Sequence, residues 1–347
     1  FDRLARFGSL FSDFITGWTR RDSPLDIGFI DEASMLDERQ FNDLKEIFST
    51  LVLFGDPAQL APVGQSGEMM FQTLKSEQRL ELTRVHRQVA DNPIIELAHA
   101  IGDPSLDFDQ FEDLLYRLAA KDDRINLAQR VDTALMARSP VLVWRNATRV
   151  RLIQAFRNAY GAPMDTLLPG EPLICDGIEL PLKHRKKRID LETRGLIKGA
   201  QAIFLGNGRK PGFARLHVIG AEDPQVNAAS IIKIEIPDQE EPFIASPAHM
   251  RAAFAHRPAC TIHKSQGSQW PDVQVFAPDI AAAARFGRQE AGLPLWKRLA
   301  YVAITRAEHR LHWVTRSMMS RPLDALSTSD LSTAPSELKL TTEPVEG

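Results

Sequence analysis

Two acidic residues follow directly on a short apolar segment of this 347-residue chain. Residues 25–30, LDIGFI, have the length and composition of a β-strand, and Asp31 and Glu32 come immediately after it. At the carboxyl end of a strand in a parallel sheet, an aspartate can hold Mg²⁺ through water. A neighbouring glutamate can orient or deprotonate an attacking water. The same pair also suits the first turn of a helix, where acidic side chains interact favourably with the helix dipole.

A second apolar segment, residues 50–54, is followed by another polar set. It stops at Gly55 and then presents Asp56 and Gln59, with Pro57 restricting the turn between them. A side-chain amide can accept a hydrogen bond from a water and donate one to a phosphate oxygen. By itself, Gly-Asp-Pro is equally typical of a plain β-turn. Two neighbouring strands that deliver carboxylates and an amide to one edge, however, supply what a phosphate–metal site needs.

Strands that alternate with helices would position these side chains. Residues 37–50 carry a helical apolar face, and Asn92 is expected to cap a helix over residues 92–101. Further along the chain, strands are predicted over 140–144, 272–276 and 310–314, with helices through Tyr160 and Ala300. This alternation predicts an α/β fold with a parallel sheet, preceded by helix and loop in residues 1–24.

The pattern changes between Pro169 and Ala255, where short β-like runs are broken by glycine, proline and charge. This texture predicts a small β-barrel-like insertion, with residues 205–212 as a hairpin turn. The basic run 183–188, KHRKKR, fits either a solvated loop or a contact with DNA phosphates. The segment 317–347, rich in Ser, Thr and Pro, is predicted to be disordered.

Composition excludes several classes of protein. The net charge is −3, so any nucleic-acid binding requires a local basic groove. Cys175 and Cys260, the two cysteines, lie far apart in the chain and lack a metal-binding pattern, which indicates buried thiols in a reducing compartment. No apolar run has the length of a membrane span, and the charged first residues do not form a secretory signal. We therefore expect a cytoplasmic protein with no membrane partner.

The chain resembles the superfamily 1 helicases through five ordered motifs. FIDEAS at 29–34 and LFGDPAQLAPVG at 53–64 resemble motifs II and III, and LTRVHRQ at 82–88 resembles motif IV. TIHKSQGSQW at 261–270 and LAYVAITRAEHRL at 299–311 resemble motifs V and VI. Residues 141–156 and the β-rich insertion resemble the RecD/Dda-like branch, whose members move 5′→3′. The resemblance implies two RecA-like P-loop NTPase domains, over 1–83 and over 84–168 with 256–316, and an SH3-like domain over 169–255.

The resemblance also implies roles for individual residues. Asp31 would hold Mg²⁺ through water, Glu32 would activate water, and Gln59, Arg87 and Arg306 would contact the γ-phosphate of ATP. The remaining nucleotide contacts would come from Gly55, Asp56, Gln266, Gly267 and Gln269, and the DNA contacts from Pro62, Thr261, His263 and Lys264. Two residues depart from the family pattern: Gln269 stands where a glutamate is usual, and Ala61 where a proline is usual. Taken without its motif, His263 is better explained as a partly buried structural histidine.

One expected element is not found. A nucleoside triphosphatase of this type needs a G-x-x-x-x-G-K-[ST] loop, and the sequence contains none, which suggests an N-terminally shortened chain with little ATPase activity of its own. Trp144 and Trp270 could stack on bases, although core packing is the simpler expectation. The predicted function is an ATP- and Mg²⁺-dependent helicase acting on single-stranded DNA and duplex junctions, with a nuclease or replication protein as a further partner. The alternatives are a non-catalytic DNA-binding or assembly subunit and an RNA-directed helicase.

Overall fold

The fold comes from a computed structural model, which describes residues 2–5, 15–19, 25–62, 69–80, 92–179, 185–237, 239, 242–244 and 251–328. Its contacts divide the chain into two units. Unit 1 comprises residues 1–152 and 259–321, and unit 2 comprises residues 153–258 and 322–347. This division groups the first α/β segment with the second, whereas the resemblance places them in separate domains. The domain boundaries inferred from the sequence remain a prediction.

The first α/β segment of unit 1 is a strand–helix–strand unit. The parallel strands β3 (Leu25–Ile30) and β4 (Phe48–Leu53) are joined by helix α1 (Glu38–Ile47). Asp37 caps α1, because its carboxylate accepts from the Gln40 N–H while the Gln40 side chain accepts from the Asp37 N–H. The two strands are not buried as the sequence predicted, since the Phe29 side chain is 70% exposed. A sheet of two strands cannot cover both of its own faces.

Residues near the amino-terminal end form strands where helix and loop were expected. Strand β1 (Asp2–Ala5) pairs antiparallel with β2 (Ile15–Thr19). The helical expectation was therefore wrong for these two segments. The second segment, ITGWT, contains β-branched residues and a tryptophan, which favour extended backbone.

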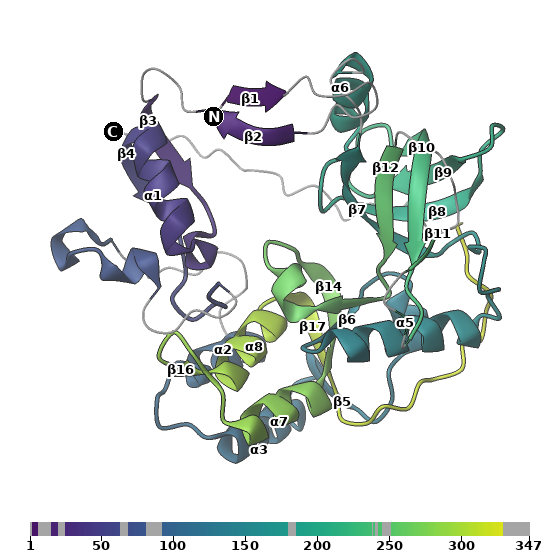
Figure 1. The fold of residues 1–347 in the computed structure, drawn as a ribbon. Helices are drawn as coiled ribbons and strands as arrows, with labels where there is room; N and C mark the ends of the chain where they lie inside the picture. The colour runs from purple at the N-terminus through teal and green to yellow at the C-terminus, as the bar shows by residue number, and fades with distance from the viewer. Residues whose placement is uncertain are drawn as a thin grey trace, which may run out of the picture. The chain divides into compact units, whose positions relative to one another are not determined.

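A five-stranded parallel sheet forms the rest of unit 1 (Figure 1). Its order is β13 (Ala259–Thr261), β6 (Val141–Val143), β14 (Trp270–Phe276), β17 (Ala307–Val314) and β5 (Ile125–Ala128). Every neighbouring pair in it is parallel, which confirms the predicted sheet type. The edge strand β5 was not recognised in the sequence, because its four residues are too short to show a period.

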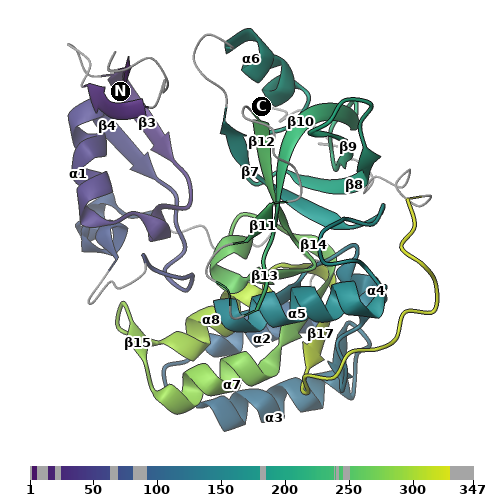
Figure 2. The same ribbon diagram turned by 45° about the vertical axis from the view of Figure 1, so that its right-hand side comes forward.

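Helices cover both faces of this sheet. The main core of unit 1 joins α2 (Pro93–Ile101), α3 (Phe108–Ala119), α7 (Ala277–Phe286) and α8 (Leu295–Ile304) to one face. In both ribbon views α3 lies beside α7, and α2 beside α8 (Figures 1 and 2). Leu142 belongs to this core, whereas its neighbours Val141 and Val143 are buried outside it, so they point to the opposite face. Helix α5 (Asn146–Ala159) directly follows β6, as predicted, and Asn92 caps α2 as predicted.

Short elements complete unit 1. They are the helix α4 (Thr133–Met136), the 3₁₀ turns η1 (Ala33–Met35), η2 (Met70–Thr73), η3 (Ser76–Gln78) and η5 (Ile262–Ser265), and the hairpin of β15 (Gln289–Glu290) and β16 (Leu293–Pro294). Trp270 is buried in the main core and Trp144 packs against it, which confirms core packing for both.

Unit 2 contains a small closed ring of strands. Strands β10 (Gln225–Ile234), β12 (Arg251–His256), β7 (Pro172–Glu179), β8 (Gln201–Asn207) and β9 (Phe213–Val218) pair in that order, and β9 pairs back to β10. Strand β11 (Phe243–Ile244) adds to the end of β10. Alternate residues of β10 are buried inside the ring. The predicted β-rich insertion and its hairpin between β8 and β9 are confirmed, while its likeness to an SH3 fold remains a prediction.

The basic run of the insertion is not a loop where it is described. Residues 185–188 begin helix α6 (Arg185–Thr193), and Arg188 forms an ion pair with Glu192 one turn later. The sequence interpretation of a loop was wrong here, because the acidic residues that follow the basic run support a helix through i,i+4 pairing.

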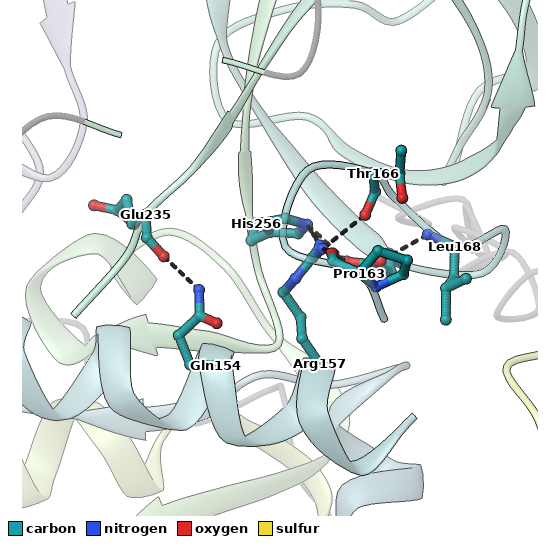
Figure 3. A network of polar contacts seen from close by, with 8 residues as sticks. Gln154, Arg157, Pro163, Thr166, Leu168, Glu235 and His256 are labelled. Atoms are coloured by element: carbon teal, nitrogen blue, oxygen red, sulfur yellow. Dashed lines mark hydrogen bonds and ion pairs between the residues drawn. The ribbon is translucent and has the colours of Figure 1, made fainter. Parts of the chain in front are cut away.

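A buried network of polar side chains lies where α5, the start of β7 and the end of β12 meet in unit 2 (Figure 3). Arg157 near the end of α5 donates to Glu171, 2.6 Å away, and Glu171 lies 2.7 Å from His256 at the end of β12. Arg157 also donates to the carbonyls of Pro163 and Thr166. The network therefore joins the segment that enters the β-rich insertion to the strand that leaves it.

Two further observations concern the remaining chain. Within the segment predicted to be disordered, Met318 and Ser320 form backbone hydrogen bonds with Val131, so these residues are ordered by pairing with another segment of unit 1. None of the helices that the structure describes is long and apolar enough to cross a membrane.

Candidate functional site

The acidic pair and the Asp56–Gln59 turn leave the same edge of the β3–β4 pair. The Ala33 N–H donates to the Phe54 carbonyl, and the Phe54 N–H donates to the Ile30 carbonyl, both at 2.8 Å. These bonds continue the parallel pairing beyond the strand ends. Asp31 and Glu32 therefore lie at the carboxyl ends of parallel strands, which is where α/β proteins bind ligands.

Glu32 has a strained backbone. Its φ of 52° and ψ of 40° are in the left-handed region, which costs a residue with a Cβ atom about 1–2 kcal/mol. The preceding Asp31 side chain accepts from the Glu32 N–H at 2.8 Å, and Ala33 and Ser34 behind it are fully buried. Strain of this kind is concentrated at functional sites, because the surrounding structure must hold it in place. Glycine would relieve the strain but would remove the carboxylate.

Asp56 organises the turn that carries Gln59. One of its carboxylate oxygens accepts from the Ala58 N–H at 2.9 Å, and its carbonyl accepts from the Gln59 N–H at 3.1 Å. The other carboxylate oxygen accepts from the Tyr301 hydroxyl on α8 at 2.7 Å. Both oxygens thus have protein partners, so the structure gives Asp56 a role in shaping the turn.

The Gln59 side chain meets the segment that follows β13. The Gln266 amide donates to the Gln59 side-chain oxygen across 3.4 Å. The Gln266 side-chain oxygen is buried and accepts no hydrogen bond among the described residues. A buried acceptor of this kind is costly unless something donates to it. The neighbouring Gly267 has a φ of +73°, a conformation that favours glycine.

The residues predicted to contact DNA lie on and beside η5. Thr261 ends β13, and His263 and Lys264 lie in η5, with Lys264 exposed and the other two partly buried. Burial lowers the pKa of His263 below its usual value, so this side chain is neutral at pH 7. Pro62 is partly buried and follows the buried residues Leu60 and Ala61.

Arg306 is buried at the end of α8, as the apolar run before it predicts. Its guanidinium donates to the Val302 carbonyl, the Ser268 carbonyl and the Thr305 hydroxyl at 3.1–3.3 Å. Arg306 is therefore joined to the loop of Gln266–Gln269, in which Gln269 is partly buried. Arg87, the second arginine expected at the γ-phosphate, lies outside the described residues.

Sequence reasoning missed Arg298. This arginine on α8 is 1% exposed and donates to the carbonyls of Pro57 and Gln59, so it contacts the turn directly. Burial lowers the pKa of Arg298, while the carboxylates of Glu290 and Asp56 oppose that change. Its spacing could have revealed it: Arg298 and Tyr301 are three residues apart and share one face of a helix that leads to Arg306.

Buried Asp279 was also missed. Its carboxylate is fully buried at the start of α7 and accepts from the backbone N–H groups of Trp144 and Arg145 at 3.0 and 2.9 Å. It also accepts from the Arg145 side chain and from the Thr148 hydroxyl. These bonds fix the first turn of α5. No pattern in the sequence links position 279 to positions 144–148, because these segments follow two different strands, β14 and β6, which become neighbours only in the folded sheet.

The described residues contain no group of three or more His, Cys, Asp or Glu side chains that could hold a metal ion. The carboxylate of Asp31 is exposed. Mg²⁺ in nucleotide sites is commonly held by one or two carboxylates, several waters and the substrate phosphates. The residues present therefore fit such an ion, but not a metal enclosed by protein ligands.

Comparisons with known proteins agree with this architecture. Residues 4–125 match the AAA domain family, and residues 258–314 match the UvrD-like helicase C-terminal domain family. The Pif1 helicase from Bacteroides in complex with ADP-AlF3 and ssDNA is 16% identical with a TM-score of 0.50, over 91% of this chain and 79% of that one. Bacteroides Pif1 bound to ssDNA is 14% identical with a TM-score of 0.50, over 84% and 70%. Pif1 from Candida albicans is 15% identical with a TM-score of 0.48, over 84% and 72%. No curated protein sequence matches the chain.

Proposed function

Because this chain carries the domains of a superfamily 1 helicase of the RecD/Dda-like branch, we propose that it works in an ATP-dependent helicase that moves along single-stranded DNA. The observation that carries this proposal is the shared edge of β3 and β4. There Asp31 and Glu32 follow one strand, and the turn of Gln59 follows the next. The two Bacteroides Pif1 structures contain ssDNA, and one contains ADP-AlF3, which supports nucleotide and DNA as ligands.

In this proposal each side chain has one task. Asp31 holds Mg²⁺ through water, and the ion neutralises charge on the phosphates when it is bound. Glu32 orients and deprotonates the attacking water. The Gln59 amide contacts the γ-phosphate and distinguishes ATP from ADP. The buried Gln266 oxygen beside it, which lacks a donor among the described residues, fits a ligand hydroxyl or a water.

The arginines supply charge to the same reaction. Arg87 and Arg306 stabilise the γ-phosphate during transfer, since a guanidinium stays charged and forks onto phosphate oxygens. The bond of Arg306 to the Ser268 carbonyl joins this arginine to the loop that follows η5, and its bond to the Val302 carbonyl holds it against α8. They support a coupling between the nucleotide site and the DNA-contacting residues of η5. Gly55, Gly267 and Gln269 complete the nucleotide contacts.

Single-stranded DNA binding is proposed for Thr261, His263, Lys264 and Pro62. Lys264 presents an exposed positive charge, whereas His263 is neutral at pH 7 and serves only as a hydrogen-bond partner. The protein is proposed to act in the cytoplasm at the nucleoid, at duplex junctions and with a nuclease or replication protein.

Binding of a fluorescent oligothymidylate tests the DNA assignment. Lys264→Ala should weaken binding and reduce the slope of log K against log salt by about 0.7, because one phosphate contact on a single strand is lost. Lys121→Ala, at another exposed lysine of unit 1, is the matched control and should leave the slope unchanged. Equal slopes for both variants, or no binding by the unmodified chain, would contradict the assignment. An RNA strand that binds more tightly than DNA would favour an RNA-directed helicase.

Hydrolysis is tested separately. No Gly-Lys-Ser/Thr loop is present in these 347 residues, so we expect this polypeptide to hydrolyse ATP slowly. In a protein that also contains such a loop, DNA-stimulated ATP hydrolysis should fall at least about a hundredfold in Glu32→Gln, in the range typical of removing a general base. Full activity in that variant would refute the role of Glu32 as general base, whereas no DNA-stimulated hydrolysis by the unmodified protein would favour the non-catalytic subunit.

A further inference from the structure

Two side chains on one face of helix α8 form hydrogen bonds with the turn of Gln59, and we call this set of contacts the grip of α8 on the turn. Arg298 and Tyr301 are three residues apart, so they lie one above the other on the helix. Arg298 contacts the carbonyls of Pro57 and Gln59, and Tyr301 contacts the carboxylate of Asp56. The turn is therefore held at its backbone on both sides of Ala58 and at the carboxylate that shapes it.

The contacts of Arg298 use the shape of the guanidinium. One terminal nitrogen donates to the Pro57 carbonyl at 2.8 Å and to the Gln59 carbonyl, and the other donates to the Ala291 carbonyl at 2.9 Å. The remaining Nε–H donates to the Glu290 carbonyl at 2.8 Å. A lysine offers a point charge and cannot span these four acceptors, which lie in two separate chain segments. Removing the guanidinium would take this donor from three carbonyls in partly buried contacts and from the buried contact at Ala291, which is costly.

Packing anchors the same turn to the same helix. Leu60 is fully buried in the main core of unit 1, which also contains Leu299 and Val302 of α8. Ala61 is fully buried against Ala291 and Met69. The turn and the helix therefore share one core and one set of polar contacts, so a displacement of either one breaks bonds in both.

We propose that Arg298 and Tyr301 are positioning residues that set the place of Gln59 and join it mechanically to Arg306. Helix α8 continues for six residues beyond Arg298, a rise of about 9 Å, and Arg306 follows two residues after its end, so a displacement of the helix at Arg298 also displaces Arg306. A change at the γ-phosphate side of the turn would then reach the loop of Ser268 and η5 through this helix. This inference rests on the proposed function for the identity of the nucleotide, whereas the grip of α8 on the turn does not depend on it.

Amide hydrogen exchange of the full chain tests the grip directly. In Arg298→Met, exchange at the amides of Ala58 and Gln59 should rise at least about tenfold, since hydrogen bonds to a charged donor are lost. In Arg298→Lys the exchange rate at these amides should rise nearly as far, because one ammonium group cannot replace the guanidinium. Tyr301→Phe, which removes one hydroxyl, should give a smaller rise.

Lys297→Met is the matched control. Lys297 is the neighbouring residue on α8, is 3% exposed, and donates to the carbonyls of Asp103 and Pro104 at 2.5 and 3.3 Å. Its loss also removes a buried cation from α8 but leaves the turn untouched, so exchange over residues 55–61 should stay within about twofold of the unmodified chain. If Arg298→Met leaves exchange in this segment as low as Lys297→Met does, the grip is refuted.

The mechanical link has its own readout. In a protein that also contains a Gly-Lys-Ser/Thr loop, the affinity for a fluorescent non-hydrolysable ATP analogue, which carries a γ-phosphate, is measured with and without an oligothymidylate, and the ratio of the two affinities gives the coupling. Arg298→Met should bring this ratio to about one, while Lys297→Met should keep it. An equal loss in both variants would mean that Arg298 is only structural. If the loop-containing protein, with α8 unchanged, binds neither ligand, the proposed function fails, and the exchange experiment still decides whether Arg298 holds the turn.

Discussion

Replacing Glu171 by glutamine tests the reasoning about the buried network of unit 2. Glu171 and Arg157 are 0% and 1% exposed, and Glu171 accepts from Arg157 through one oxygen and from the Leu168 N–H through the other. His256 lies 2.7 Å from the same carboxylate (Figure 3). Glutamine has the same shape but no charge, so the Arg157 guanidinium would stay buried without its counter-charge.

Breaking one partner of a buried ion pair costs about 3–5 kcal/mol. Because Arg157 keeps its bonds to the carbonyls of Pro163 and Thr166, we expect Glu171→Gln to cost about 3 kcal/mol, the lower end of that range. Each 1.4 kcal/mol is a factor of about ten in an equilibrium constant, so the open form of unit 2 should become about a hundredfold more populated.

The two cysteines make this measurable, because each unit contains one of them. Cys175 is buried in β7 of unit 2, and Cys260 is buried in β13 of unit 1. Burial also raises the pKa of the Cys175 thiol, so labelling requires opening. In Glu171→Gln, Cys175 should react with a thiol reagent about a hundredfold faster, and Cys260 should react at its original rate.

The matched control is Glu192→Gln in α6. It breaks the half-exposed ion pair with Arg188 in the same unit, and exposed pairs contribute under about 1 kcal/mol. The reasoning is refuted if Cys175 reacts as slowly in Glu171→Gln as it does in Glu192→Gln.

Three further predictions concern unit 1. Glu32→Gly should raise thermal stability by about 1 kcal/mol relative to Glu32→Gln, because glycine relieves the left-handed backbone; equal melting temperatures would contradict the strain. Burial raises the pKa of Glu290, while Arg298 and the Ala61 N–H oppose this. Folding therefore favours the neutral form of Glu290. The contribution of this neutral form to the free energy of unfolding is complete below the usual glutamate pKa, and it is lost as the pH rises through the raised pKa. Glu290→Gln should thus stabilise the protein more at pH 7 than at pH 4 in thermal melts, and the opposite order would refute this. Asp279→Ala should cost about 3 kcal/mol and change the fluorescence of Trp144, because the backbone N–H of this residue loses its acceptor; an unchanged melting curve would contradict the role given to this carboxylate.

Several features of this protein follow from local sequence patterns. The helix cap at Asn92, the strand at Val141–Val143, the hairpin of β8 and β9 and the parallel sheet type were all predicted correctly. Each of them depends on neighbouring residues or on a repeating period, which a single sequence displays. The motif order likewise indicated a helicase, and residues 258–314 match the UvrD-like helicase C-terminal domain family.

Other features depend on contacts between distant segments, and only the tertiary structure decides them. The exposure of Phe29 on β3 depends on how many strands join the sheet, and the apolar composition of the strand does not reveal that number. Arg298 looks like an ordinary helix-surface cation until the fold places the carbonyls of Pro57 and Gln59 against it. The sequence determines which groups can form hydrogen bonds; the tertiary structure decides which of them are buried together, because burial depends on chain segments that lie hundreds of residues apart.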